Sequence, residues 1–193
     1  MKRLWKICVF LVLALTAVCG LNGCIIRQNS LSEIMQEAGE AEQETADRSI
    51  PAAFEGMDMD GNPVSSDVFS GAELTMVNVW ATYCNPCLME MPGLGELAGA
   101  YEKSEFQILG IISDVQEESA QEMKDYAAEL IKQTGAAYPH LLLNESIYRS
   151  LLTEVTAVPT TFFFNSEGEL LDTVVGSMEK EKWKELIDAF LEK

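Results

Sequence analysis

The stretch that decides the fold is Trp80-Ala81-Thr82-Tyr83-Cys84-Asn85-Pro86-Cys87. It is entered through Leu74–Trp80, a mostly apolar run rich in valine that is typical of a buried strand. Pro86 suits the first turn of a helix, where its missing N–H is not needed. A strand, a short turn, two cysteines separated by two residues and a helix together indicate a redox-active cysteine pair.

Length and charge limit what the chain can be. It has 193 residues, which fits one well-buried domain with appendages, and a formal net charge of −18 at pH 7. Nucleic-acid binding depends on clustered Lys and Arg side chains that contact phosphates. We therefore expect no nucleic-acid partner.

The N-terminus has the pattern of a secretory signal. Lys2, Arg3 and Lys6 precede the uncharged, mostly apolar run Ile7–Val18. As a helix this run would span about 18 Å, which is shorter than the ~30 Å hydrocarbon core of a bilayer. The pattern predicts export of whatever follows.

Directly after this run comes Leu21-Asn22-Gly23-Cys24, which resembles a bacterial lipobox. The resemblance implies that residues 1–23 are a lipoprotein signal peptide, cleaved before Cys24, and that Cys24 carries lipid. Asn22 departs from the small apolar residue that is usual there, so an uncleaved N-terminal transmembrane anchor is the alternative.

Composition then changes twice. Residues 24–49 are polar and acidic and contain no aromatic residue, which predicts a flexible linker. From Ile50 onward the sequence has the apolar content of a folded domain, so we expect one domain over residues 50–193. Cys84 and Cys87 are the only cysteines in that range. Such a pair must exchange electrons with other proteins.

The domain alternates strand and helix patterns and predicts an α/β fold with a mixed central sheet flanked by helices. Phe54–Met57 followed by Asp58–Val64 predicts an N-terminal β-hairpin with a Gly-containing turn, and a strand and helix are inserted farther along. Beyond Leu74–Trp80 and the helix after the cysteines, we expect strands at Phe106–Ser113 and Tyr138–Leu143, helices at about Val115–Gln133, Glu145–Leu152 and Glu179–Leu191, and a hairpin of Thr160–Phe164 with Leu170–Val175. Asp114, or Ser119 with Glu122, is expected to cap the second helix, and Met123 and Tyr126 to lie on its buried face.

The positions of the cysteines suggest their roles. Cys84 precedes the helix, whose N-terminal partial positive charge stabilises a thiolate. Cys87 lies one turn deeper. We expect Cys84 to attack a partner's disulfide and Cys87 to resolve the mixed disulfide, with no cofactor and no metal. Glu90 is three residues beyond Cys87 on the same helix, either as a buried proton partner or as a solvent-facing glutamate.

The cysteine motif, Glu90, Pro92 and the later Val158-Pro159-Thr160-Thr161-Phe162 together resemble the thioredoxin superfamily, in its membrane-tethered TlpA-like and ResA-like branch. The resemblance implies a thioredoxin fold over about residues 50–193. It implies a cis Pro159 facing the cysteines, with the Val158 backbone as a docking edge and Tyr83 beside it in place of the usual tryptophan. It also implies that Glu90 is a buried carboxyl that tunes the pair.

The resulting hypothesis is a thiol–disulfide oxidoreductase, lipid-anchored on the extracytoplasmic face of a bacterial cytoplasmic membrane. It would reduce disulfides in exported proteins, such as those of cytochrome c biogenesis, and be recharged by a membrane thiol donor. An oxidant that forms disulfides and a redox-inert binding lipoprotein are the alternatives.

Two other kinds of site were weighed from the residues. A zinc site would need Cys84, Cys87, His140 and a carboxylate. His140 is expected instead to be a packed or edge histidine on its strand. A peroxidase would need its reactive cysteine in a different setting, because a Cys-x-x-Cys pair at a strand-to-helix turn fits disulfide exchange better.

Overall fold

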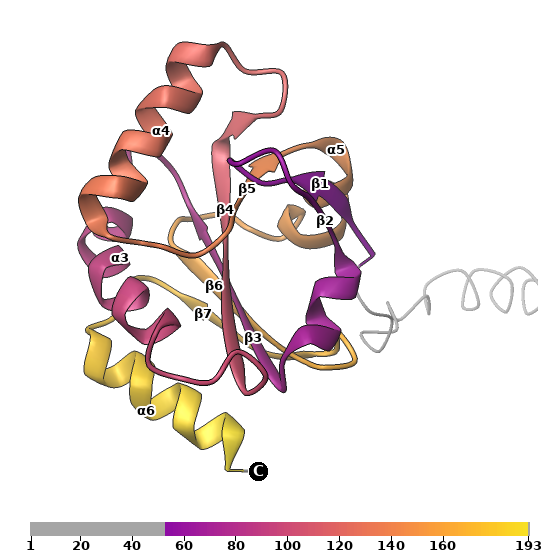
Figure 1. Ribbon diagram of the computed structural model, residues 1–193, viewed down its shortest axis with the longest axis vertical. Coiled ribbons are helices and arrows are strands. Elements are labelled where there is room, and N and C mark those ends of the chain that lie inside the picture. The colour runs from indigo at the N-terminus through magenta and orange to yellow at the C-terminus, as the bar shows by residue number, and fades with distance from the viewer. Residues whose placement is uncertain (1–52, 193) are drawn as a thin grey trace, which may run out of the picture. The chain divides into compact units, whose positions relative to one another are not determined.

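The computed structural model describes residues 53–192 (Figure 1). The predicted signal peptide, Cys24, the linker and the first residues of the predicted domain lie outside this range. The strands are β1 (Glu55–Met57), β2 (Pro63–Ser65), β3 (Leu74–Trp80), β4 (Phe106–Gln116), β5 (His140–Leu143), β6 (Thr160–Asn165) and β7 (Leu170–Val175). The helical segments are η1 (Ser66–Gly71), α3 (Asn85–Ala98), α4 (Gln121–Thr134), α5 (Glu145–Ile147), the π-helical η2 (Tyr148–Leu152) and α6 (Lys180–Leu191).

The main sheet has five strands in the order β5-β4-β3-β6-β7. β3 is its centre, and all of its residues are buried. It pairs in parallel with β4, to which it is joined through α3, and antiparallel with β6. Parallel neighbours require such a crossover, whereas β6 and β7 need only a short turn. The predicted mixed sheet is confirmed.

Each face of the sheet carries its own apolar core, because alternate residues of a strand point to opposite faces. α3, α4 and α6 lie on one side of the sheet, and η1, the β1–β2 hairpin and α5 lie on the other (Figure 1). On β3, Met76 and Trp80 belong to the core under α3 and α6, and Val77 and Val79 to the opposite core. The cysteine pair belongs to the first of these cores.

The N-terminal hairpin is confirmed as a separate two-stranded sheet. It attaches to β5 through a bridge between Asp58 and Leu141 and a 2.8 Å hydrogen bond from Met59 N to His140 O. β5 and the short α5 form the inserted strand and helix between β4 and β6. The hairpin therefore lies along one edge strand of the main sheet.

The prediction for the helix after β4 was wrong at its start. β4 continues to Gln116 and α4 begins only at Gln121, without a side-chain cap. Ser119 instead accepts a hydrogen bond from the backbone N–H of Gln116. The buried face was also wrong in part, since Met123 and Tyr126 are 44% and 56% exposed. The other predicted elements are present, with ends that differ by a few residues at most.

Candidate active site

The two cysteines lie where β3 ends and α3 begins. Cys84 is the N-cap of α3, and its Sγ accepts a 3.3 Å hydrogen bond from the backbone N–H of Cys87. They form a disulfide with each other. Cys84 is 5% exposed and Cys87 is fully buried. The cysteine that retains some exposed surface is therefore the one at the helix N-terminus, where a thiolate is stabilised.

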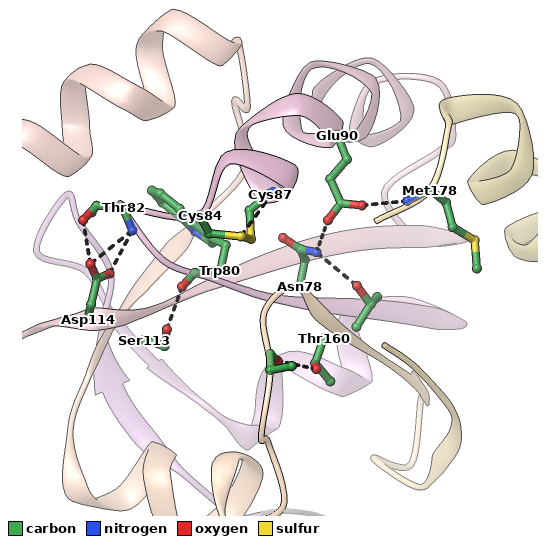
Figure 2. The surroundings of a disulfide bond; sticks show 12 residues. Asn78, Trp80, Thr82, Cys84, Cys87, Glu90, Ser113, Asp114, Thr160 and Met178 are labelled. Carbon is green, nitrogen blue, oxygen red and sulfur yellow. Dashed lines mark hydrogen bonds between the residues drawn. A yellow bond between two sulfur atoms is a disulfide. The ribbon is translucent and has the colours of Figure 1, made fainter. Parts of the chain in front are cut away.

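The turn between β3 and Cys84 is held by the end of β4. The carboxylate of Asp114 accepts hydrogen bonds from the backbone N–H and the hydroxyl of Thr82 (Figure 2). The neighbouring Ser113 hydroxyl donates to the carbonyl of Trp80 at 3.0 Å. Asp114 is thus not a helix cap, as the sequence suggested, but a partner of the turn that leads to the cysteines.

Glu90 is buried, with 5% of its surface exposed, so the solvent-facing alternative is wrong. Burial raises the pKa of its carboxyl, and hydrogen bonds from Met178, Asn78 and Trp183 oppose that shift. Asn78 Nδ2 donates to Oε1 at 3.0 Å and Met178 N to Oε2 at 3.1 Å (Figure 2). Trp183 Nε1 also donates to Oε2, at 3.2 Å. The carboxyl is therefore held by three donors from different parts of the fold.

Asn78 was not identified from the sequence as a site residue. Its amide lies in the same row of β3 as Met76 and Trp80, and it also donates to the hydroxyl of Thr161 on β6 at 3.0 Å. Asn78 and Thr161 are both completely buried. A polar residue inside an otherwise apolar strand was the available signal, since buried amides require hydrogen-bond partners.

The peptide bond between Val158 and Pro159 is cis, as the resemblance implied. β6 begins directly afterwards and pairs Thr160 with Val79 of β3, so Val158 and Pro159 lie beside the end of β3 that leads to the cysteines. Within residues 53–192, neither backbone polar group of Val158 makes a hydrogen bond. Tyr83 is 74% exposed, and Met89, which the sequence analysis did not single out, is 81% exposed.

His140 is a packed histidine, as predicted. It is 3% exposed, accepts a hydrogen bond from Trp80 Nε1 at Nδ1, and contacts the carbonyl of Ala136 through Nε2. Burial lowers its pKa to about 4. Both ring nitrogens therefore have partners in the protein. In the part of the chain that the structure describes, no cluster of three or more His, Cys, Asp or Glu side chains could hold a metal ion.

A Cys-x-x-Cys pair at the N-terminus of the helix that follows the central strand of a thioredoxin fold, with a cis-proline at the start of the neighbouring strand β6, defines a thiol–disulfide oxidoreductase. The chain belongs to the AhpC/TSA family, whose sequence model matches residues 47–172.

Named relatives agree with this class. Sporulation thiol-disulfide oxidoreductase A of Bacillus subtilis is 25% identical over 149 residues, covering 76% of this chain and 85% of the relative. Thiol-disulfide oxidoreductase ResA of Bacillus cereus is 24% identical over 187 residues, covering 96% of this chain and 95% of the relative. A thiol:disulfide interchange protein of Chlorobium tepidum has a similar structure, with a TM-score of 0.61, 25% identity, and coverage of 73% of this chain and 95% of that one.

Proposed function

We propose that the chain is an exported, lipid-anchored thiol–disulfide oxidoreductase that reduces disulfides in other exported proteins. The observation that carries this proposal is the asymmetry of the pair: Cys84 keeps an exposed fraction of 5% at the helix N-terminus, and Cys87 is fully buried beneath it. One sulfur can meet a partner and the other can reach only its neighbour. The direction of electron flow rests on the resemblance to the ResA-like branch.

The reaction needs only the two thiols. In the reduced protein, the Cys84 thiolate attacks one sulfur of a partner's disulfide, so that a mixed disulfide forms and the partner's other sulfur leaves as a thiolate. Cys87 then loses its proton and attacks Cys84 Sγ, which closes the observed disulfide and releases the reduced partner. Two electrons pass to the partner, and a membrane thiol donor returns them in the reverse exchange.

Glu90 is proposed to take the proton of Cys87 in the second step. Its carboxyl is on the same helix, one turn beyond Cys87, and burial raises its pKa, so this carboxyl binds a proton more readily than an exposed glutamate does. The partner's chain is proposed to dock between Tyr83 and Val158–Pro159. The unpaired backbone groups of Val158 offer hydrogen bonds to an extended segment.

The organisation of the N-terminal region stays a proposal: residues 1–23 as a signal peptide, Cys24 as the lipid site and residues 24–49 as a linker on the outer face of the membrane. The alignment with ResA of Bacillus cereus supports a shared layout, since it covers 96% of the chain and so extends into this region. Among residues 53–192, no helix is long and apolar enough to cross a membrane.

Equilibration of the Cys84–Cys87 pair with glutathione tests the function. Potentials in this fold range from about −270 mV to about −120 mV, and a reductant belongs near the lower end. A value near the upper end would make the protein an oxidant. A pair that neither forms nor exchanges its disulfide would leave only the binding lipoprotein.

A trapping experiment tests the two roles. Cys87→Ser should accumulate mixed disulfides through Cys84 in membranes, because the resolving thiol is gone. Cys84→Ser is the matched control and should trap nothing, since Cys87 is fully buried. Equal trapping by both variants would contradict the assigned order of attack.

Labelling with a fatty acid tests the anchor. Label should be incorporated into the wild type and lost in Cys24→Ala. Cys19→Ala removes a nearby cysteine within the predicted signal and should still be labelled. Persistent membrane association of an unlabelled wild-type chain would favour the uncleaved anchor.

A further inference from the structure

The two oxygens of the Glu90 carboxyl are not equivalent. Oε2 accepts hydrogen bonds from Met178 N and Trp183 Nε1, whereas Oε1 accepts only from Asn78 Nδ2. A carboxylate oxygen has two lone pairs available for hydrogen bonds. Those of Oε2 are occupied, so a proton that Glu90 takes up binds at Oε1. The protonated oxygen then faces Asn78.

Asn78 supports the ionised form in the observed orientation. Its Nδ2 donates to Glu90 Oε1 and to Thr161 Oγ1, each at 3.0 Å, so both amide hydrogens are used. Its Oδ1 is buried and has no hydrogen-bond partner. No hydrogen bond on that side holds the amide in place. Rotation about the Cβ–Cγ bond would turn Oδ1 toward Glu90, where it could accept the proton on Oε1.

Thr161 is suited to either orientation. Its hydroxyl, which now accepts from Asn78, can donate to Oδ1 after the rotation because a hydroxyl is both donor and acceptor. Thr161 stands directly opposite Asn78 in the β3–β6 register and two residues after the cis-proline. The same amide therefore joins the Glu90 carboxyl of α3 to Thr161 of β6.

We propose that Asn78 is a positioning residue for the exchange reaction. Its amide donates a hydrogen bond to Glu90 when that carboxyl is ionised, and turns to accept one when the carboxyl is protonated. The Thr161 hydroxyl accepts from Asn78 in the first state and donates to it in the second. This proposal rests on the proposed function in one respect: it takes Glu90 to be the group that exchanges a proton with Cys87. Its consequence is that Oε1 has a hydrogen-bond partner in both protonation states of the carboxyl. The two arrangements are not equal, because the rotation carries both Nδ2 hydrogens to the side where the amide has no partner, so Asn78 favours the ionised form of Glu90.

Other ionisable groups near Glu90 do not replace this arrangement. β3 and β6 present Asn78 and Thr161, and the α6 side presents Trp183 and the backbone of Met178, none of which titrates. From the segment before β5, burial and the charge of Glu90 raise the pKa of Tyr138 well above its usual range, so this phenol stays neutral. Cys87, on the same helix as Glu90, does not titrate while it is in the disulfide. Lys180, at the start of α6, is paired with Glu96.

The test is a pH titration of the full-length, oxidised chain in detergent, followed by NMR. The ¹³C signal of the Glu90 carboxyl, assigned by its absence in Glu90→Gln, gives the protonation state. The side-chain ¹⁵N signal of Asn78 reports the amide. We expect both signals to move with the same midpoint. An Asn78 signal that stays constant while Glu90 titrates would overturn the proposal.

Variants extend the test. Asn78→Leu removes the one donor on Oε1 and should increase the proton affinity of Glu90 about tenfold, since a hydrogen bond to a charged group is lost. Thr161→Val should shift the midpoint in the same direction by less, and Thr161→Ser should restore it. Thr75→Val is the matched control, because Thr75 is an equally buried β-strand threonine whose hydroxyl contacts Gln107 rather than the Asn78 network.

If Asn78→Leu does not fold, the comparison of Thr161→Val with Thr161→Ser decides the matter. A midpoint that Thr161→Val and Thr75→Val leave equally unchanged would refute a role for the hydroxyl. These measurements need no exchange partner and no reduced thiol. If the cysteine pair fails to exchange with glutathione, the proposed function is refuted, but the NMR titrations are unaffected. If the Asn78 signal stays constant, the proposed rotation of Asn78 is refuted, but the exchange is unaffected.

Discussion

The buried His140 predicts a measurable loss of stability in acid. Nδ1 accepts the hydrogen bond from Trp80, so the ring is neutral with its proton on Nε2, toward the carbonyl of Ala136. Burial lowers the pKa from 6.5 to about 4. Between those values the unfolded chain binds a proton that the folded chain does not, so stability is present above pH 6.5 and is lost as the pH falls. At 1.36 kcal/mol per unit, the loss at pH 4 is about 3 kcal/mol.

The assay is urea unfolding of the oxidised protein, followed by tryptophan fluorescence at a series of pH values from 7 to 4. Carboxyl groups also titrate in this range, so the quantity of interest is the difference between wild type and His140→Gln. The glutamine keeps one acceptor and one donor but does not titrate. We expect the wild type to lose about 3 kcal/mol relative to the variant by pH 4. Stability curves that run parallel from pH 7 to 4 would refute the reasoning.

Three further predictions use the same unfolding assay. Glu90→Gln should give a pH dependence of the opposite sign. Because the pKa of Glu90 is raised, the folded wild type binds this proton more tightly than the unfolded chain, so the wild type should lose stability relative to the variant as the pH rises above 4.5. A stability difference that does not depend on pH would contradict this. Gly110→Ala places a Cβ 2.2 Å from His140 Nδ1 and should lower the free energy of unfolding by about 1–3 kcal/mol. Gly71→Ala is the control and should be nearly neutral, because the nearest side-chain atom to its added Cβ is 3.6 Å away. Equal losses of stability in the two variants would show that the His140 ring moves freely. Thr82→Val removes the hydroxyl hydrogen bond to Asp114 but keeps the backbone one, and should lower the free energy of unfolding by about 1 kcal/mol. Thr173→Val, on the exposed β7, is the control and should leave stability unchanged. Equal stability of the two variants would mean that the Thr82 hydroxyl bond contributes nothing.

Local patterns in the sequence were sufficient for the sheet. β3 could be predicted because its residues are buried on both faces and form a mostly apolar run. The β6–β7 hairpin could be predicted because Asn165-Ser166-Glu167-Gly168 carries turn chemistry, and Gly168 indeed has a φ of 79°. Each of these signals lies within a few residues of the element it predicts.

Asp114 is a residue whose partner local sequence patterns could not predict. As a residue between an apolar run and a helical pattern, it has the form of an N-cap. Its actual partner, Thr82, is 32 positions earlier, and the two meet because β3 and β4 are parallel and end side by side. Propensity contains no information about such a pairing. The start of α4 was misplaced for the same reason, since β4 continues beyond the point where its local pattern ends.

The environment of Glu90 depends on long-range contacts to a still greater degree. Met178 and Trp183, which bond Oε2, follow Glu90 by 88 and 93 positions, and Asn78 precedes it by 12. A buried carboxyl without donors would simply remain protonated, because desolvation penalises the charge. The donors that oppose this come from β3, from α6 and from the segment before α6. The C-terminal helix therefore does more than cover the sheet. By supplying Trp183 to Glu90, it takes part in setting the proton affinity of the carboxyl that lies one helical turn beyond Cys87.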